Sequence, residues 1–270
     1  MKERRMRLPL TLAAASRHAY ALAAAVGCVA MIAATPSQAT DAFSPQQKTG
    51  IEKIIHDYLV ANPEVIREAI DELEKRQKAQ ELASREKVVN EQGEKIIHSA
   101  NQAVVGNPDG DVTLVEFFDY NCGYCKQSLA SIAKLIEGDP KLRVVLKDFP
   151  ILGTDSVETA QIATAARMQL NPAKFWEFHK KLLSTRGHIG KTQALAAARE
   201  VGADMDRLEK DAAGAETQAA LKEVATLADQ LKFDGTPSWV IGKEAIVGGV
   251  PLAQLKAKID NMRKCGKAAC

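Results

Sequence analysis

The chain has 270 residues, of which 36 are Lys or Arg and 34 are Asp or Glu, giving a formal net charge of +2. A balance this close to neutrality, without a basic patch, does not favour a nucleic-acid partner. The length is sufficient to bury a core and fits one domain with an extension.

The N-terminus has the layout of a secretory signal peptide. Basic residues among the first seven positions precede an apolar run over 20–34, and a small-residue cleavage pattern ends at Ala39. The run is about 15 residues long, which is short for a membrane span of roughly 20. We therefore expect residues 1–39 to be cleaved near Ala39 and the remainder to be exported. An uncleaved anchor helix and lipidation at Cys28 are the alternatives.

Residues 44–92 have the pattern of two helices. Ser44–Pro45 combines an N-cap with a first-turn proline, and Asn62–Pro63 begins a second helix. The sequence Asn90–Gly93 indicates that this second helix breaks there. We therefore expect residues 40–101 to form a helical stalk and a linker.

Apolar residues cluster at one end of this helical segment. They recur at helical spacing between Ile51 and Leu73, whereas residues 74–80 contain one alanine and six polar residues. A charged connector cannot bury itself, so these apolar stripes need some partner. We expect residues 44–73 to assemble a homo-oligomer. The alternative is that the stripes pack on the protein's own core.

The pattern changes after about residue 102 to alternating strands and helices. In chain order, we expect a strand at 113–118, a helix at 122–137, a strand at 142–146, a helical block at 156–232, strands at 238–241 and 245–247, and a helix at 251–262. This order is that of a thioredoxin-like α/β fold with a helical insertion. We assign the fold to residues 102–263, which leaves a C-terminal tail at 264–270.

Four cysteines remain if residues 1–39 are removed: Cys122, Cys125, Cys265 and Cys270. The first two form a C-x-x-C motif that follows a predicted strand and starts a predicted helix. The free N–H groups and the dipole of a helix start stabilise a thiolate. We expect Cys122 to face solvent and act as the nucleophile, and Cys125 to be buried and resolve the mixed disulfide.

A metal site and an inert staple are the alternatives to thiol exchange. A metal site needs more ligands than C-x-x-C supplies, and the five histidines show no ligand spacing. We therefore expect neither a metal nor a cofactor. For Cys265 and Cys270 we expect a peripheral disulfide, because Gly266 lets the chain turn and the compartment is oxidising. Free thiols and an auxiliary metal or redox site are the alternatives.

Two further features belong to the predicted site. Thr236–Pro237 precedes a strand; if this bond is cis, the Thr236 backbone turns outward beside the sulfurs and can pair with an extended substrate. An ordinary trans proline is the alternative. Glu116 is a carboxylate within an apolar strand, where burial would raise its pKa and let it accept a proton from Cys125. A solvent-facing Glu116 is the alternative.

Three motifs resemble those of the DsbA-like thioredoxin-fold family: GNPDGDVT at 106–113, VEFFDYNCGYCK at 115–126 and DGTPSWVIG at 234–242. The resemblance extends over about residues 102–263. The segment FSPQQKTGIEKIIHDYLVANPEVIREAIDELEKRQ at 43–77 is similar to the stalk of ScsC-type proteins, from the bacterial suppressor-of-copper-sensitivity system.

The resemblance implies a periplasmic protein that can be trimeric through its stalk and is reduced by a membrane thiol reductase similar to ScsB. By motif matching, it makes Cys122 and Cys125 the redox pair. It also makes Thr236–Pro237 the cis-proline motif and Glu116 the buried acid.

The dipeptide Gly123–Tyr124, at the substrate-facing side of the motif, departs from strongly oxidising family members, whose dipeptide contains His. With Thr236 before the proline, it is more similar to periplasmic disulfide isomerases. Without that cation, the pKa of Cys122 should lie between about 3.5, the DsbA value, and the free value of about 8.5. The features together favour a protein disulfide isomerase or reductase acting on exported proteins. A DsbA-like dithiol oxidase and a copper-binding, copper-tolerance protein are the alternatives.

Overall fold

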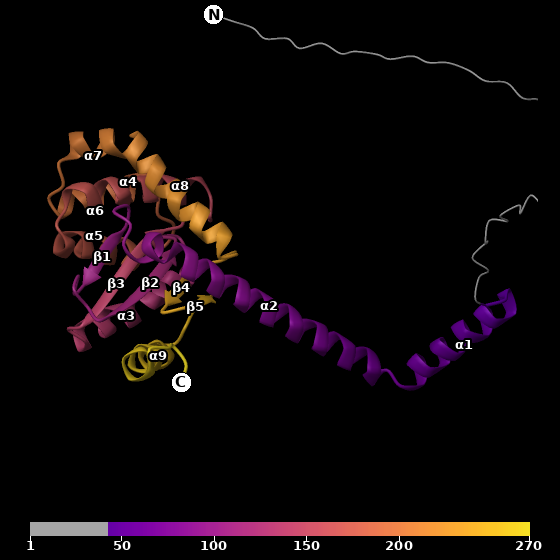
Figure 1. Ribbon diagram of the computed structural model, residues 1–270. Helices are drawn as coiled ribbons and strands as arrows, with labels where there is room; N and C mark the ends of the chain where they lie inside the picture. Colours follow the sequence, from indigo (N-terminus) through magenta and orange to yellow (C-terminus); the bar gives the residue numbers. More distant parts are fainter. Residues whose placement is uncertain (1–42) are drawn as a thin grey trace, which may run out of the picture. The chain divides into compact units, whose positions relative to one another are not determined.

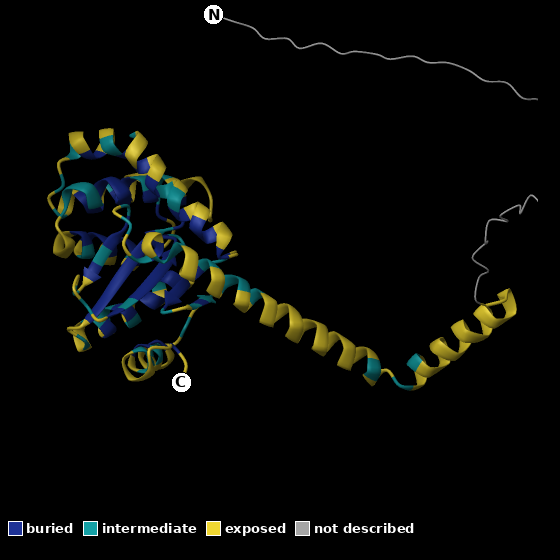
Figure 2. Cartoon of the chain, viewed as in Figure 1, coloured by how far each residue is buried: buried dark blue, intermediate teal, exposed yellow. Residues whose placement is uncertain are grey.

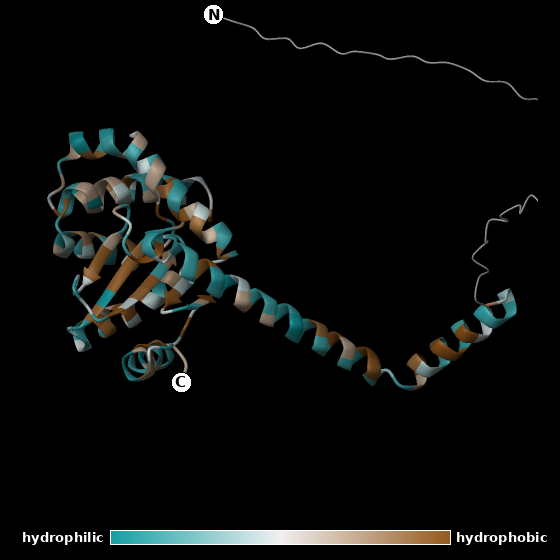
Figure 3. Ribbon diagram, viewed as in Figure 1, coloured by the Kyte–Doolittle hydropathy of each residue, from teal (hydrophilic) through white to brown (hydrophobic). Residues whose placement is uncertain are grey.

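The computed structural model describes residues 43–270, so the expected signal peptide at 1–39 and Cys28 lie outside the described residues. The chain divides after Asn62 into two units. Helix α1 (Pro45–Ala61) belongs to the first unit, and Ser44 and Gln47 close a capping box at its start. No residue of α1 is buried, and the hydropathy colouring of Figure 3 shows apolar residues along it. The large exposed apolar side chains of α1 are Ile51, Ile54, Ile55, Tyr58 and Val60.

Helix α2 (Glu64–Ile97) starts after Pro63, as predicted, but the predicted break at Asn90–Gly93 is wrong. The helix continues because Val89 and Ile96, two turns apart, are both buried in a core on the sheet. Figure 2 shows that the first half of α2 is mostly exposed, whereas its second half mixes exposed and intermediate residues with the buried Val89 and Ile96. Three large apolar side chains in the first half are exposed: Ile66, Ile70 and Leu73.

A five-stranded sheet forms the centre of the second unit, in the order β1-β3-β2-β4-β5. The strands are β1 (Ala103–Gly106), β2 (Val112–Phe118), β3 (Leu142–Asp148), β4 (Ser238–Ile241) and β5 (Glu244–Val247). The central strand β2 is parallel to β3 and antiparallel to β4. Strand β1 was not predicted; it is a four-residue edge strand antiparallel to β3, too short to produce a clear period.

Helices cover both faces of the sheet (Figure 1). They are α3 (Gly123–Gly138), α4 (Thr154–Gln169), α5 (Pro172–Ser184), α6 (Lys191–Glu200), α7 (Met205–Ala212), α8 (Ala215–Gln230) and α9 (Leu252–Cys265). Helices α4 to α8 form the predicted helical insertion between β3 and β4. Within residues 43–270, no helix is both long and apolar enough to cross a membrane.

Two hydrophobic cores lie on the two faces of the sheet. In β2, Leu114 and Phe118 belong to the core that contains α3 and α9, whereas Val115 and Phe117 belong to the core shared with α2 and α8. Side chains alternate between faces along a strand, so a strand covered on both sides is apolar throughout. Glu116 therefore shares a face with Leu114 and Phe118, and this is the face on which α3 begins.

Candidate active site

The C-x-x-C motif lies where β2 leads into α3. Cys122 is the N-cap of α3, and its N–H donates to the Asp119 carbonyl oxygen at 3.0 Å. The Cys125 side chain is fully buried, and both cysteines are free thiols. Cys122 is only 6% exposed. The expectation that it faces solvent is therefore wrong, because the segment before β4 approaches its sulfur.

Hydrogen bonds stabilise the thiolate form of Cys122. The largest effect is the hydrogen bond donated by the Cys125 thiol, and the Thr236 side chain and backbone N–H groups at the start of α3 add to it. Burial opposes these bonds, and the pKa of Cys122 falls to about 5. This value lies within the predicted interval. Burial raises the pKa of Cys125, and its donation to Cys122 raises it further. The outer sulfur is therefore the anion at neutral pH, and the inner sulfur keeps its proton.

The Thr236–Pro237 peptide bond is cis. Across 114 residues of sequence, the Cys122 sulfur lies 3.1 Å from the Thr236 carbonyl oxygen, to which it can donate when it is protonated. Thr236 is partly exposed, whereas Pro237 is buried and its carbonyl oxygen accepts from the Gly248 N–H at 2.8 Å. The structure thus brings Thr236, from the start of β4, to the sulfur of the motif.

Glu116 is fully buried in the centre of the sheet, where it faces Leu146 of β3 and Trp239 of β4 in the ladder. The Ser128 hydroxyl donates to Glu116 Oε1 at 2.7 Å, and Oε2 has no partner. The pKa of Glu116 is raised to about 8, mainly by burial; the hydrogen bond from Ser128 opposes this shift, and the Cys122 charge adds to it. This carboxyl group can therefore gain and lose a proton near neutral pH.

The dipeptide between the two cysteines forms the open side of the site. Gly123 is exposed, and a Cβ placed on it would meet no atom within 4 Å. The Tyr124 ring is 66% exposed and lies beside Gly249, which follows β5. Both residues are therefore exposed to solvent within the motif.

Asp119 and Asn121, directly before the motif, were not singled out from the sequence. The Asp119 side chain is 2% exposed and accepts the Asn121 N–H and the Ser156 hydroxyl, each at 2.8 Å. The sequence does contain a pattern that indicates Asp119: a carboxylate between a buried strand and the start of a helix, where free N–H groups need acceptors.

The histidines among the described residues do not gather into a metal-binding group. Among residues 43–270, no group of three His, Cys, Asp or Glu side chains could hold an ion. His179 is fully buried, and its Nδ1 lies 3.2 Å from the Tyr120 hydroxyl. Burial lowers the pKa of His179 to about 3, so it is a neutral packing residue. His188 pairs with Asp155 at the surface.

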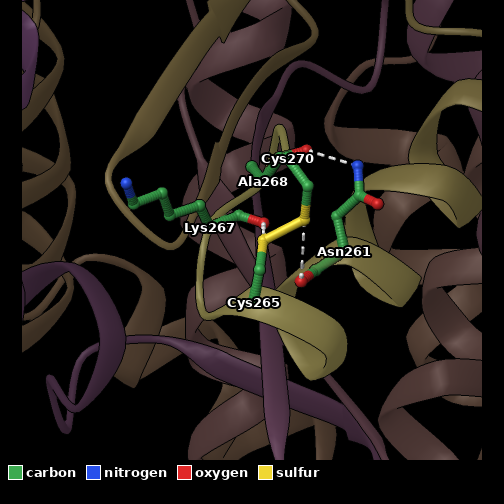
Figure 4. Close-up of a disulfide and its surroundings, with 5 residues drawn as sticks. All are labelled: Asn261, Cys265, Lys267, Ala268 and Cys270. Atoms are coloured by element: carbon green, nitrogen blue, oxygen red, sulfur yellow. Dashed lines mark hydrogen bonds between the residues drawn. A yellow bond between two sulfur atoms is a disulfide. The ribbon is translucent and has the colours of Figure 1, made fainter.

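The predicted disulfide between Cys265 and Cys270 is present, with the two Cα atoms 6.4 Å apart (Figure 4). Gly266 ends α9 in the left-handed region at φ 72°, which lets the chain turn back as expected. The loop places Ala268 in the core at 6% exposure, and Asn261 Nδ2 donates to the Ala268 carbonyl oxygen at 3.3 Å. The bridge therefore closes the end of the fold over α9.

Two family models match the chain. One, described as the DSBA-like thioredoxin domain, matches residues 113–260, which is more than half of the chain. The other, described as the copper resistance protein ScsC N-terminal domain, matches residues 47–80, which span most of α1 and the first half of α2.

Solved structures support the thioredoxin-like α/β fold. A thioredoxin-like oxidoreductase from Silicibacter pomeroyi DSS-3 is 40% identical with a TM-score of 0.60, covering 64% of this chain and 98% of that chain. ScsC from Proteus mirabilis in a transitional conformation is 25% identical with a TM-score of 0.60, covering 81% of this chain and 98% of that chain. These similarities, with the family match, confirm the predicted fold.

A curated relative shows the same domain within a longer protein. The Na(+)/H(+) antiporter NhaA 1 of Salinispora arenicola is 28% identical over 159 residues, which is 58% of this chain and 24% of the antiporter. The chain therefore matches about a quarter of the antiporter's length.

Proposed function

Because the chain belongs to the family of DSBA-like thioredoxin domains, we propose that it acts on proteins as a disulfide isomerase or reductase. Its general activity is that of a thiol–disulfide oxidoreductase, with a C-x-x-C motif at the start of α3. Cys122 is the proposed attacking sulfur, because its pKa is about 5 and it is the sulfur beside Thr236.

The proposed reaction begins when the Cys122 thiolate attacks a substrate disulfide. The substrate S–S bond breaks, a mixed disulfide forms with Cys122, and the second substrate sulfur leaves as a thiolate. In isomerisation, another substrate thiolate attacks the mixed disulfide and regenerates the Cys122 thiolate without net oxidation. In reduction, the Cys125 sulfur attacks instead, which releases the reduced substrate and leaves a Cys122–Cys125 disulfide.

Cys125 must lose its proton before it can attack. Glu116 is the proposed acceptor: it is fully buried, its pKa is about 8, and its charge contributes to the raised pKa of Cys125. The substrate-binding role is proposed for Thr236 and Pro237, with Gly123 and Tyr124 at the exposed side. The free carbonyl and amide groups of an extended substrate can pair with backbone beside a cis proline.

The observation that favours an isomerase over an oxidase is the exposed apolar surface of residues 44–73. Large apolar side chains in α1 and the first half of α2 are between 38% and 70% exposed. Large apolar side chains left exposed on both helices are typical of an assembly interface. We propose that these residues assemble a homo-oligomer, specifically a trimer. Several reduced sites then face one substrate, and the oligomer shields Cys122 from oxidases.

We propose that the protein works in the periplasm after cleavage near Ala39 and is kept reduced by a membrane thiol reductase resembling ScsB. The corresponding division of the chain is a signal peptide at 1–39, a stalk and linker at 40–101, a catalytic domain at 102–263 and a tail at 264–270. The similarity to ScsC supports this assignment.

The test of the proposed function is refolding of scrambled ribonuclease A by residues 40–270. We expect activity to be recovered at a rate that falls to the uncatalysed level in Cys122→Ser. In Cys125→Ser, mixed disulfides with the substrate should accumulate, because the internal attack that clears them is lost. Alkylation of the reduced protein first at Cys125, rather than at Cys122, would contradict the assignment of the two sulfurs.

Two alternative functions give different results in the same preparation. A DsbA-like oxidase would accelerate oxidation of a reduced substrate but would not refold the scrambled one. A copper-tolerance protein is favoured by the name of the family that matches residues 47–80. Two adjacent thiols, Cys122 and Cys125, suit Cu(I), which prefers soft sulfur ligands. Competition with a Cu(I) chelator, in the parent and in Cys122→Ser, measures that binding directly.

A further inference from the structure

The residue before Cys122 is held by a loop of the helical insertion. Asn121 Oδ1 accepts the Ile189 N–H at 2.7 Å, and Asn121 Nδ2 donates to the Ile189 carbonyl oxygen at 2.8 Å. Ile189 lies between α5 and α6 and is fully buried. The two bonds join residues 68 apart in sequence. The side-chain amide of Asn121 therefore forms two hydrogen bonds with the backbone of one residue, accepting one and donating the other, as a residue in a neighbouring β-strand would.

A buried carboxylate holds Asn121 from its other side. Asp119 Oδ1 accepts the Asn121 N–H and the Ser156 hydroxyl, each at 2.8 Å. Asp119 Oδ2 accepts the N–H groups of Ile151 and Leu152 at 2.9 and 3.0 Å. Both oxygens of this carboxylate are thus used to fix backbone and side chains around the turn into α3.

The same loop of the insertion is held after the motif as well. Lys126 Nζ donates to the carbonyl oxygens of Thr185 and Gly187 at 3.1 and 2.7 Å. Lys126 is one turn beyond Cys122, and its N–H donates to the Cys122 carbonyl oxygen at 3.0 Å. The segment from Thr185 to Ile189 is therefore bonded on both sides of the C-x-x-C motif, by Lys126 and by Asn121.

We propose that Asn121, fixed by Asp119 and Ile189, is a positioning residue that holds the Cys122 sulfur against the N-terminus of α3. None of the hydrogen bonds of Asn121 reaches a sulfur atom, so it acts only through the backbone of Cys122. The proposal rests on the proposed role of Cys122 as attacking sulfur, and it makes the loop 185–189 part of the reactive centre.

The physical reason is the short range of the interactions that stabilise a thiolate. The N–H groups of Tyr124 and Cys125 and the Thr236 side chain act on the Cys122 sulfur only within hydrogen-bond distance. Cys122 is the N-cap and has an extended backbone, at φ −74° and ψ 121°; its carbonyl oxygen accepts the first helix bond, but its N–H bonds to Asp119 outside the helix. A change in the ψ angle of Asn121 or the φ angle of Cys122 would move the sulfur away from these donors.

The test is the pH profile of Cys122 alkylation by iodoacetamide in residues 40–270, with the alkylated residue identified by mass spectrometry. We expect Asn121→Ala to raise the midpoint by about one pH unit, which is about a tenfold loss of thiolate below that midpoint. The control is Thr217→Val, because Thr217 is a polar side chain that is fully buried and donates one hydrogen bond, to the Asp211 carbonyl oxygen at 2.7 Å. This control should lose stability without any change in midpoint.

A second variant covers the case in which Asn121→Ala does not fold. Ser156→Ala removes the hydroxyl that donates to Asp119 and accepts from Asn121 Nδ2 at 3.1 Å, and should raise the midpoint in the same direction. An unchanged midpoint in the folded variants, with alkylation still at Cys122, would overturn the positioning role. Alkylation of the parent first at Cys125 would instead overturn the proposed function, so the two failures are distinguishable.

Discussion

At the level of single residues, the Cys122 thiolate is stabilised without a neighbouring cation. Its pKa of about 5 results from hydrogen bonds donated by Cys125, the Thr236 side chain and backbone N–H groups. Dipoles of this kind stabilise an anion less than a fixed positive charge in contact with it. The lower the pKa of Cys122, the more stable the reduced form of the pair. A positive charge introduced at Tyr124 should therefore make the pair more oxidising.

Tyr124→His should make the redox pair more oxidising. Tyr124 is 66% exposed, so the substitution leaves the core unchanged and adds a side chain that can be protonated near Cys122. A nearby opposite charge should lower the pKa of Cys122 by about one unit. The measurement is the equilibrium with glutathione, in which the reduced fraction should increase. Tyr124→Phe is the control. If the reduced fraction increases equally in this variant, the charge of the histidine is not the cause.

Glu116 should make the unfolding free energy fall as pH rises. The folded pKa is about 8, above the usual 4.5, so between these values the folded state keeps a proton that the unfolded chain has released. The slope within this window is about 1.4 kcal/mol per pH unit. We expect Glu116→Gln, whose oxygen can still accept from Ser128, to remove this slope. Urea unfolding at pH 5 and pH 7.5 measures it.

The Glu116 measurement needs two controls. Cys122 contributes with the opposite sign, because its folded pKa of about 5 is depressed and its stabilisation is lost as pH falls through that value. Both proteins should therefore carry Cys122→Ser. Glu137→Gln is the matched control, since Glu137 is an exposed residue of α3. A slope that persists in Glu116→Gln would show that another buried group, such as Asp148, dominates.

At the level of elements, buried cations fix the end of α2 to the catalytic domain. Lys147 Nζ donates to the Lys95 carbonyl oxygen at 3.0 Å, and Arg143 Nη1 donates to the Ile97 carbonyl oxygen at 2.8 Å. The last carbonyl groups of a helix lack partners within it and attract positive charge. The β3 side chains thus terminate a helix that precedes them by about 50 residues.

Arg85 makes a second attachment, between the middle of α2 and the end of α8. Its guanidinium donates to the carbonyl oxygens of Leu231 and Lys232 at 3.0 and 3.1 Å and lies over the Phe233 ring. The Arg85 side chain is only 12% exposed. The region of α2 from Arg85 onward is therefore packed against the catalytic domain and is not a free stalk.

Arg85→Ala should destabilise the second unit by roughly 2–4 kcal/mol, because two carbonyl groups lose charged donors. Arg85→Lys should recover only part of this, since one ammonium group cannot reproduce the planar fork. Denaturant unfolding of residues 40–270 is the measurement. The control is Arg76→Ala on the same helix, whose side chain is 72% exposed and pairs only with Glu72 and solvent. A loss as large in the control would show that helix propensity, not the attachment, is responsible.

At the level of the whole molecule, the attachment of α2 decides which truncation is informative. The large exposed apolar side chains of α1 and early α2 end at Leu73, whereas Arg85, Val89 and Ile96 belong to the second unit. Removing residues 40–73 therefore removes the proposed interface alone. Removing residues 40–92 also removes two attachments to the catalytic fold.

Deletion of residues 40–73 should give a stable monomer that still oxidises dithiols but loses isomerase activity. Deletion of residues 40–92 should give the same monomer with a lower melting temperature, because Arg85 and Val89 are lost. Sedimentation velocity, ribonuclease refolding and thermal unfolding measure the three properties. A monomeric parent protein of residues 40–270 would contradict the oligomer, and with it the isomerase assignment.

The sequence by itself determined the local chemistry of the site. A C-x-x-C motif between a strand and a helix places both sulfurs at one helix start, because residues three apart lie on the same face. Thr236–Pro237 before a strand and Glu116 inside an apolar strand are also local patterns. The structure places Thr236 at the Cys122 sulfur, and it places Glu116 against Ser128, whose hydroxyl also contacts the Cys125 carbonyl oxygen. The apolar stripes before Leu73 were visible for the same reason.

Only the tertiary structure decided which distant segments complete the site. The Cys122 sulfur meets Thr236 across 114 residues, and Asn121 meets Ile189 across 68. The end of α2, wrongly predicted at Asn90–Gly93, is set by packing of Ile96 and by cations from β3. Periodicity reports which face of an element is apolar, but not what that face packs against. Such contacts depend on the arrangement of the whole sheet, which no local pattern contains.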